Sequence, residues 1–215
     1  MPSAGTLAEP QTEPWRGAPA APPNILWICT DQQRFDTIHA LGNPHVRTPN
    51  LDRLVARGVA FTRAYCTSPI CTPSRASFLT GRYPRTTRAR WNGNTEFPPD
   101  EVLVTRLLAE AGYDCGLVGK LHLAGAQKRV EPRTHDGYRV FQWSHHPAPD
   151  WPESDYIRWL CEKGETWQAH YHLPPPGARH AYAGMPAPLH QTTWCAEKAI
   201  QFLSEPRQGP WLMSV

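Results

Sequence analysis

The sequence is short of the features that mark a membrane or nucleic-acid protein. No apolar run is long enough to cross a bilayer. The 22 basic residues nearly balance the 19 acidic ones, so no excess of charge points to nucleic acid or to an acidic membrane. The N-terminus lacks the basic start and apolar core of a secretory signal. We therefore expect a cytoplasmic chain with neither a membrane nor a nucleic-acid partner.

Cysteine is also sparse, and its six copies have no regular spacing. Only Cys66 and Cys71 are near enough in the sequence to suggest a disulfide or a shared metal ion, and no second Cys or His pair at zinc-finger spacing supports a metal. The others lie in apolar or helical runs, where a reduced thiol is the usual state; they are Cys29, Cys115, Cys161 and Cys195. This cysteine usage also favours a cytoplasmic location.

Proline and tryptophan, by contrast, are abundant. The 24 prolines and 9 tryptophans indicate long ordered loops and aromatic-lined surfaces rather than a helical bundle. Residues 1–22 are rich in Pro and Ala and are predicted to be a disordered leader. The length of 215 residues allows one good core, so residues 23–215 are expected to form one domain or part of one.

Short apolar segments alternate with helical patterns over the rest of the chain. Residues 24–30 form a continuous apolar run, which is typical of a central parallel strand buried on both faces. The further predicted strands are 59–65, 113–119 and 211–215, and the predicted helices are 49–57, 74–80, 100–111, 152–163 and 191–204. Residues 123–150 are rich in loop formers. The alternation predicts an α/β fold with a mostly parallel central sheet flanked by helices.

Two of the predicted helices have apolar stripes and end signals. Thr48 is a suitable N-cap with Pro49 at the first helical position, and Gly58 ends that helix. Its apolar stripe consists of Leu51, Leu54 and Val55. In the helix over 100–111, which Gly112 caps, the side chains expected to face inward are Val104, Leu107, Leu108 and Ala111.

Polar residues follow two of the predicted strands. Asp31 and Gln32 follow the first strand, and Lys120 and His122 follow the third. Ligands bind just beyond the carboxyl ends of parallel strands, so these four residues are candidates for one site. Asp31 is an oxygen ligand suited to a hard cation. Lys120 and His122 point the same way on an extended segment, which suits a tetrahedral anion; taken singly, a solvated strand end and a structural histidine are the alternatives.

Cys71 lies at the predicted start of a helix. Pro73 suits the first turn of a helix, so we expect Cys71 just before the N-terminus of the helix that begins near Ser74. Backbone N–H groups there favour an anion, and Arg75 can reach back toward the same point. The alternative is a structural cysteine at a helix cap. A cysteine-phosphatase loop is disfavoured, because such loops are longer and glycine-rich between their Cys and Arg.

The run Cys71-Thr72-Pro73-Ser74-Arg75 resembles the signature that sulfatases carry. Further blocks, in the same order, resemble that family's first strand, first helix, second strand and a segment that supplies a Lys and a His to the sulfate; they are 24–31, 48–54, 58–62 and 112–122. The resemblance runs from about residue 23 to the end of the chain. It implies a truncated fold of the alkaline-phosphatase and sulfatase type.

By that resemblance, the activity is hydrolysis of small-molecule sulfate esters. Cys71 is converted by a formylglycine-generating enzyme to formylglycine, an aldehyde whose hydrate attacks sulfur. The implied catalytic residues are Cys71, Arg75, Lys120 and His122. In this scheme Lys120 and Arg75 stabilise charge on the sulfate, and His122 holds the ester or helps to protonate the leaving oxygen.

The resemblance also implies a divalent cation and a substrate contact. The cation is Ca²⁺ in the first place, with Mn²⁺ or Mg²⁺ as alternatives, and its implied ligands are Asp31, Gln32 and the modified Cys71. Asn92 is the implied substrate-binding residue. Asn94 competes with it, and a plain turn over Asn-Gly-Asn is the alternative to both.

Two departures from the family bear on these expectations. Many sulfatases have a second Asp where this chain has Gln32, which makes the chain more similar to phosphonate and phosphate diester hydrolases of the same superfamily and to a subset of bacterial sulfatases. The family's later Asp-His or Asp-Asn pair, which completes the metal shell, and a further Lys have no counterpart here. We therefore expect the N-terminal part of a longer enzyme, inactive alone and with an exposed sheet edge. An inactive, binding-only relative is a third hypothesis.

Two adjacent histidines in the loop-rich region have an open role. His145 and His146 lie near Trp143 and Trp151 in the sequence. They either line a substrate pocket or belong to a surface loop.

Overall fold

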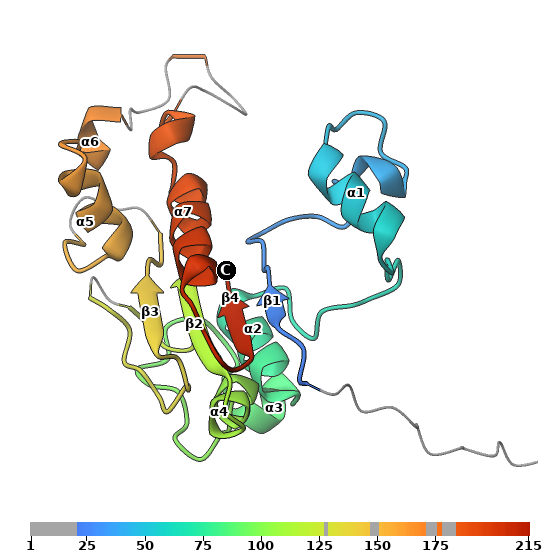
Figure 1. Ribbon diagram of the computed structural model, residues 1–215, viewed down its shortest axis with the longest axis vertical. Helices are drawn as coiled ribbons and strands as arrows, with labels where there is room; N and C mark the ends of the chain where they lie inside the picture. Colours follow the sequence, from blue (N-terminus) through green and yellow to red (C-terminus); the bar gives the residue numbers. More distant parts are fainter. Residues whose placement is uncertain (1–20, 127–128, 147–150, 171–175, 178–183) are drawn as a thin grey trace, which may run out of the picture.

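The computed structural model describes residues 21–126, 129–146, 151–170, 176–177 and 184–215 (Figure 1). Its centre is a sheet of four strands, β1 (Ile25–Trp27), β2 (Asp114–Gly119), β3 (Val140–Trp143) and β4 (Trp211–Ser214). The strand order is β1-β4-β2-β3, and every pairing is parallel. The predicted α/β class with a parallel sheet is confirmed. All but the last two residues of the predicted leader, residues 1–22, lie outside the described residues.

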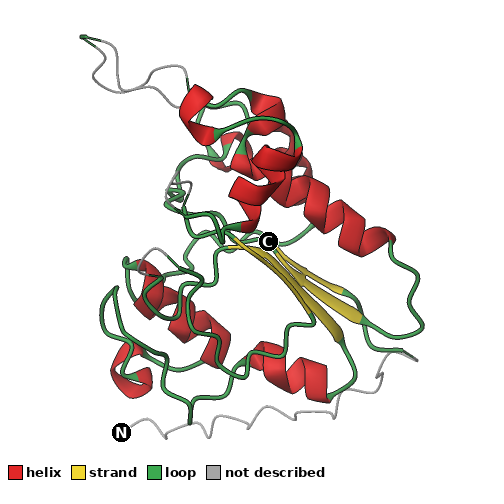
Figure 2. Cartoon of the chain, turned by 90° about the vertical axis from the view of Figure 1, so that its left-hand side faces the viewer, coloured by secondary structure: helices red, strands yellow, loops and turns green. Residues whose placement is uncertain are grey.

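Helices lie on both faces of the sheet (Figure 2). They are α1 (Pro49–Arg57), α2 (Cys71–Thr80), α3 (Pro84–Thr87), α4 (Val104–Glu110), α5 (Asp155–Glu162), α6 (Trp167–His170) and α7 (Gln191–Ser204), with the 3-10 turns η1 (His39–Leu41) and η2 (Ala187–Leu189). One apolar core joins α2 and α4 to one face, and a second joins α5 and α7 to the other. Such layers are expected where strands and helices alternate along the chain.

Successive residues of β2 divide between the two cores. Cys115 and Leu117 pack with residues of α2, whereas Val118 packs with α5 and α7, because successive side chains of a strand point to opposite faces. Gly116 faces α7, where an added Cβ would lie 2.7 Å from a ring carbon of Phe202. Glycine at this position therefore allows α7 to pack closely on the sheet.

Strand β1 corrects the prediction of a central strand buried on both faces. It lies at an edge of the sheet and pairs only with β4 within the described chain. Leu26 and Trp27 are consequently 48% and 45% exposed. An apolar run reports which residues favour burial, but the neighbours that would bury them are set by the rest of the fold.

The segment just before β1 is hydrogen-bonded to the amino ends of β2 and β4. The hydroxyl of Tyr113 donates to the carbonyl oxygen of Pro23 at 3.0 Å. The backbone N–H of Trp211 donates to Oδ1 of Asn24 at 3.2 Å. Residues 23–24 are therefore held at the amino end of the sheet.

Helix α1 begins and ends where the sequence predicts, but it does not pack on the sheet. Figure 1 shows α1 and η1 beside each other and away from the strands. The predicted apolar stripe is therefore not buried, and Leu54 is 64% exposed. The Thr48 hydroxyl donates to the Asp52 carboxylate at 2.9 Å instead of capping the helix backbone.

The strand predicted over 59–65 is wrong. These residues form no strand, and Val59, Phe61 and Tyr65 are at least 80% exposed. A β-rich pattern needs a neighbouring strand to complete its hydrogen bonds, and the described chain places none beside this segment. By contrast β3, which lies inside the region expected to be loop, does pair with β2.

Helix boundaries in the second half of the chain follow the predictions with local corrections. Helix α7 spans the predicted range, α5 is shorter than the predicted 152–163, and α6 was not predicted. Helix α4 is also shorter than predicted. Of the side chains predicted to face inward, Leu108 packs against the core, whereas Val104, Leu107 and Ala111 are exposed. Thr105 faces inward instead. Its hydroxyl is satisfied there, since it donates to the buried carbonyl of Asp136 at 2.6 Å.

The described residues include every cysteine of the sequence. All six cysteines are free thiols, so Cys66 and Cys71 do not form a disulfide. Among the helices that the structure describes, none has both the length and the apolar character that a membrane span requires.

Candidate active site

Four of the predicted site residues come together at the carboxyl end of the sheet. Asp31 follows β1, Lys120 follows β2, and Cys71 and Arg75 belong to the first turns of α2. We call these four residues the cationic cluster. Helix α2 begins at Cys71 itself rather than near Ser74, with Ile70 as the N-cap. Cys71 is therefore the first residue of the helix and does not precede it, contrary to the prediction from the sequence.

The cluster holds two positive charges against one carboxylate. Lys120 Nζ lies 2.8 Å from Asp31 Oδ2 and 3.7 Å from Cys71 Sγ. The Arg75 guanidinium lies 3.6 Å from the same Asp31 oxygen and donates to the backbone carbonyl of Lys120 at 2.6 Å. The side chains of Arg75 and Lys120 are only 10% and 18% exposed. The result is a surplus of positive charge in a partly dry site beside Cys71.

The charge state of Asp31 follows from these neighbours. Partial burial raises the pKa of Asp31, but the hydrogen bond from Lys120 and the charges of Lys120 and Arg75 outweigh burial. The pKa of this carboxyl therefore lies below its usual value, and Asp31 is ionised at neutral pH.

Asn92 and Asn94 lie in a loop beside the start of α2. Asn92 Oδ1 accepts a hydrogen bond from the backbone N–H of Thr72 at 2.9 Å. Asn92 therefore satisfies a helix donor next to Cys71, a role that the sequence alone did not indicate. Asn94 contacts a different segment, since its carbonyl oxygen accepts from the N–H of Gly125 at 2.6 Å.

His122 is buried next to the cluster, but not on an extended segment. Its φ of 54° and the φ of 110° at Gly119 turn the chain after β2, so the extended segment on which Lys120 and His122 were predicted to point the same way is not formed. Burial, then the charges of Lys120 and Arg75, lower the pKa of His122 to about 4. His122 is therefore a neutral imidazole at pH 7, and its Nδ1 has no partner among the described residues.

The second histidine of the site is His145. Its ring meets that of His122 edge-on with centroids 4.1 Å apart, and it lies 5.5 Å from the ring of Trp151. Burial, followed by the neighbouring His122 and Lys120, lowers the pKa of His145 to about 3. His145 also lines a cavity of about 460 Å³ together with Asp31, Arg75 and Lys120. His146 is exposed and does not line this cavity.

Sequence reasoning missed one residue of this region, Glu131. Its carboxylate is 2% exposed and lies directly under the backbone of residues 122–124. A single Glu before Pro carries no signal in the sequence. Only the fold, which brings residues 122–124 and β3 around it, gives it a role.

The residues present do not fit a divalent cation. Such an ion takes six or more oxygen ligands, several of them carboxylates. Here Asp31 is the only carboxylate of the predicted set, and its Oδ2 is engaged by Lys120 and Arg75. Gln32 is exposed, with a φ of 54°. Within the described residues, no group of three or more His, Cys, Asp or Glu side chains is arranged to hold a metal ion.

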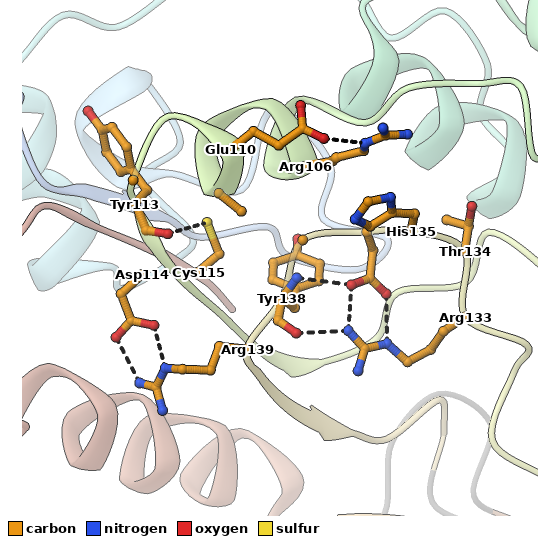
Figure 3. A pocket seen from close by; sticks show the side chains of 14 residues that line it. Arg106, Glu110, Tyr113, Asp114, Cys115, Arg133, Thr134, His135, Tyr138 and Arg139 are labelled. Atoms are coloured by element: carbon orange, nitrogen blue, oxygen red, sulfur yellow. Dashed lines mark hydrogen bonds and ion pairs between the residues drawn. The ribbon is translucent and has the colours of Figure 1, made fainter.

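A second hollow, of about 770 Å³, lies at the opposite, amino end of the sheet. We call it the ion-paired hollow. Figure 3 shows Arg106 paired with Glu110 and Arg139 paired with Asp114 on its wall. Arg133 pairs with the buried carboxylate of Asp136. Each cation of this wall has its own carboxylate, so the hollow carries no surplus charge for a ligand.

The fold and the cluster define a class of protein, and comparisons with known proteins agree. In structure, the chain is similar to the phosphonate monoester hydrolase of Agrobacterium radiobacter, with 26% identity and a TM-score of 0.67 over 90% of this chain and 40% of that one. It is also similar to a protein solved with its substrate D-glucosamine-2-N,6-O-disulfate, with 25% identity and a TM-score of 0.59 over 89% of this chain and 33% of that one. The fold is that of the alkaline-phosphatase-like hydrolases.

Similarities in sequence identify one family among the alkaline-phosphatase-like hydrolases. The model of the family named Sulfatase matches residues 23–215. Human steryl-sulfatase is 41% identical over 114 residues, which cover 48% of this chain and 20% of that protein. Bovine arylsulfatase A is 35% identical over 162 residues, which cover 68% of this chain and 32% of that protein. The chain belongs to the sulfatase family, and its matches span no more than a third of the length of these two relatives.

Proposed function

We propose that this chain carries the nucleophile and the anion-binding cluster of an enzyme that hydrolyses sulfate esters. The observation that supports the proposal is the arrangement around Cys71. The thiol lies in the first turn of a helix, 3.7 Å from Lys120 Nζ, with Arg75 buried behind. A sulfate group is a tetrahedral anion, and two desolvated cations beside a helix N-terminus favour such a group.

Cys71 fits the role of a formylglycine precursor. It is a free, half-buried thiol whose Sγ faces a lysine. Formylglycine, once formed by a formylglycine-generating enzyme, supplies a hydroxyl nucleophile through its hydrate. Lys120 and Arg75 hold and neutralise the sulfate oxygens, and Asp31 keeps both cations aligned. Neutral His122 provides an N–H donor to the ester oxygen rather than a positive charge.

The most direct test of maturation is the mass of the peptide that contains Cys71. Coexpression with a formylglycine-generating enzyme should lower this mass by roughly 18 Da, the difference between a thiol and an aldehyde. Cys71→Ala should abolish the change. Cys66→Ala is the matched control, because Cys66 is an exposed free thiol in the same segment, and it should convert like the parent. A Cys71 that remains a thiol under these conditions contradicts the proposal.

We further propose that the active enzyme contains more chain than these 215 residues. Two observations support this. The described residues do not fit the cation that the family resemblance implies. Within the same residues, β1 has a free edge, and Ile28, just beyond it, is 63% exposed. The chain alone should therefore bind Ca²⁺ weakly and hydrolyse no sulfate ester. The coding DNA beyond codon 215 tests this. An in-frame continuation with an Asp-His or Asp-Asn pair is expected, and full activity of the 215-residue chain would contradict the proposal.

A phosphonate or a phosphate diester is the second candidate substrate. Gln32 in place of a second acidic residue and the likeness to a phosphonate monoester hydrolase favour it. Turnover of an aryl sulfate against an aryl phosphonate, by a full-length enzyme that contains this chain, separates the two. Equal activity of Cys71→Ala and parent on both substrates would contradict both candidates.

A further inference from the structure

Beneath His122 lies a buried carboxylate to which the proposed reaction assigns no role. Glu131 Oε1 accepts from the backbone N–H of His122 at 2.6 Å and from Trp143 Nε1 at 3.0 Å. Its Oε2 accepts from the backbone N–H groups of Leu123 and Ala124 at 2.8 and 3.1 Å. Burial raises the pKa of Glu131 above its usual value, against the effect of these hydrogen bonds. All four partners are N–H donors, however, and none can accept a proton, so the arrangement suits the ionised carboxylate. Such charge-assisted hydrogen bonds are among the strongest that a protein makes.

These bonds impose a conformation that His122 would not otherwise adopt. Its φ of 54° is in the left-handed region, where a residue other than glycine stays only if its surroundings hold it. Three successive N–H groups that converge on one carboxylate provide this constraint. Glu131 also fixes Trp143, whose ring stacks on His145 with centroids 6.4 Å apart. His145 in turn meets the His122 ring edge-on, so one carboxylate controls both the backbone and the side-chain neighbour of His122.

We propose that Glu131 is a positioning residue, which holds His122 beside the cationic cluster and thereby sets the affinity of the cluster for a sulfate group. This inference rests on the proposed function. Glu131 itself does not touch the anion, since all four of its acceptor positions are occupied. A buried charge is costly to maintain, and here it is kept for the geometry of the residues above it.

The sign of one substitution separates positioning from electrostatics. Removal of a negative charge near an anion site should, by Coulomb's law alone, strengthen anion binding. Loss of positioning should weaken it, because a displacement of about 1 Å can lower the efficiency of a site by up to about 100-fold. In Glu131→Gln the amide NH₂ group faces backbone N–H donors, so residues 122–124 must move. We expect weaker binding.

The experiment is a titration of the 215-residue chain with inorganic sulfate at constant ionic strength, followed by calorimetry and by the NMR signal of the His122 ring. Glu131→Gln should bind sulfate about tenfold or more weakly than the parent, and its His122 signal should no longer respond to sulfate. Asp136→Asn is the matched control. Asp136 is likewise a carboxylate with 1% exposure, but it accepts from Arg133 and from the Tyr138 N–H in the ion-paired hollow. It should lose stability and keep the parent's sulfate affinity within about twofold.

The outcomes distinguish this inference from the proposed function. Sulfate binding by Glu131→Gln that equals or exceeds that of the parent overturns the positioning role and leaves the anion site intact. A parent chain that binds no sulfate overturns the anion site and the positioning role with it. If circular dichroism shows that Glu131→Gln is unfolded, Glu131→Asp decides. It keeps the charge but sets it back by one methylene, so weaker sulfate binding supports the role and parent-like binding overturns it.

Discussion

Both ends of the sheet pair basic side chains with carboxylates, but the ratio of the two kinds of charge differs. At the carboxyl end, Arg75 and Lys120 share a single oxygen of Asp31. At the amino end, Arg133 has Asp136, and Arg139 and Arg207 are matched by Asp114 and Glu205. The larger hollow is at the amino end. The surplus charge beside a thiol is at the other.

This difference shows which property marks an anion site. In a matched ion pair the two charges largely cancel each other's field, so little attraction is left for a ligand. An exposed pair also contributes little to stability. Two cations held by one carboxylate retain a net field, and burial strengthens it. If the size of the hollow or the number of charged residues decided, the amino end would be identified as the anion site. The net charge of the desolvated groups selects the carboxyl end.

The largest difference between the two ends of the sheet is expected in mild acid, where His122 at the carboxyl end should lower the free energy of unfolding. The pKa of His122 is lowered to about 4 by burial and by Lys120 and Arg75, against about 6.5 in an unfolded chain. The unfolded chain therefore takes up a proton first as the pH falls. The stability that neutral His122 contributes is complete above about pH 6.5 and is lost as the pH falls through about 4. The shift corresponds to at most about 3 kcal/mol in the free energy of unfolding.

Urea unfolding at pH 7.5, 5.5 and 4.0 measures this effect. His122→Asn should reduce the acid loss, because one of the two neighbouring histidines with a lowered pKa is removed, whereas His145 keeps its own contribution. His135→Asn replaces a histidine on the wall of the ion-paired hollow and should retain the parent profile. An acid loss that persists unchanged in His122→Asn would contradict the assignment.

The next largest effect is expected from the buried arginine of the cluster. Arg75→Met keeps much of the side-chain volume but removes a charge and the bond to the Lys120 carbonyl. Sulfate affinity should fall about thirtyfold, equivalent to about 2 kcal/mol. Arg133→Met removes a cation at the other end and should leave sulfate affinity unchanged. Calorimetric titration of both variants with sulfate measures these affinities. An equal loss of sulfate affinity in the two variants would contradict the distinction between the two ends.

A substitution between the two ends should affect stability without favouring either. Gly116→Ala places a Cβ against Phe202, and such overpacking should lower the free energy of unfolding by about 2 kcal/mol. Gly184→Ala is the control, since an added Cβ at Gly184 has no neighbour within 4 Å. Urea unfolding measures both. A stable Gly116→Ala variant would show that α7 can move away from the sheet.

The smallest effect is expected at an exposed ion pair of the hollow. Arg106 and Glu110 lie one helical turn apart on α4, and their side chains are 31% and 51% exposed. Solvent screens such a pair and side-chain entropy opposes it. Arg106→Gln should therefore leave the midpoint of thermal unfolding unchanged within error. A clear decrease would mean that the amino end depends on its matched charges more than exposed pairs normally allow.

Much of the site could be predicted because its parts follow strands. The carboxyl ends of parallel strands lie at the same end of a sheet, so Asp31 and Lys120 were expected at one end if β1 and β2 belonged to one sheet. The helix after Cys71 then set Arg75 nearby. The prediction failed locally: the backbone N–H groups of residues 122–124 converge on the carboxylate of Glu131, which no spacing in the sequence connects to them.

The errors in the fold have a common cause. Residues 24–30 and 59–65 both have the composition of strands, but burial and pairing depend on partners elsewhere. In the described chain, β1 has a strand on one side only, and 59–65 has none. Conversely, Val140–Trp143 is too short to stand out among loop residues and is a strand because β2 is there to receive it.

The fastening of residues 23–24 has a practical consequence for work with this protein. The bonds from Tyr113 and Trp211 hold this segment at the amino end of the sheet, whereas Cys71 lies at the carboxyl end. A purification tag or a reporter domain joined ahead of residue 21 therefore leaves the described fold on the side away from the thiol. Such a fusion should leave Cys71 accessible to a maturation enzyme, and a single tagged preparation can serve for mass analysis, titration and unfolding alike.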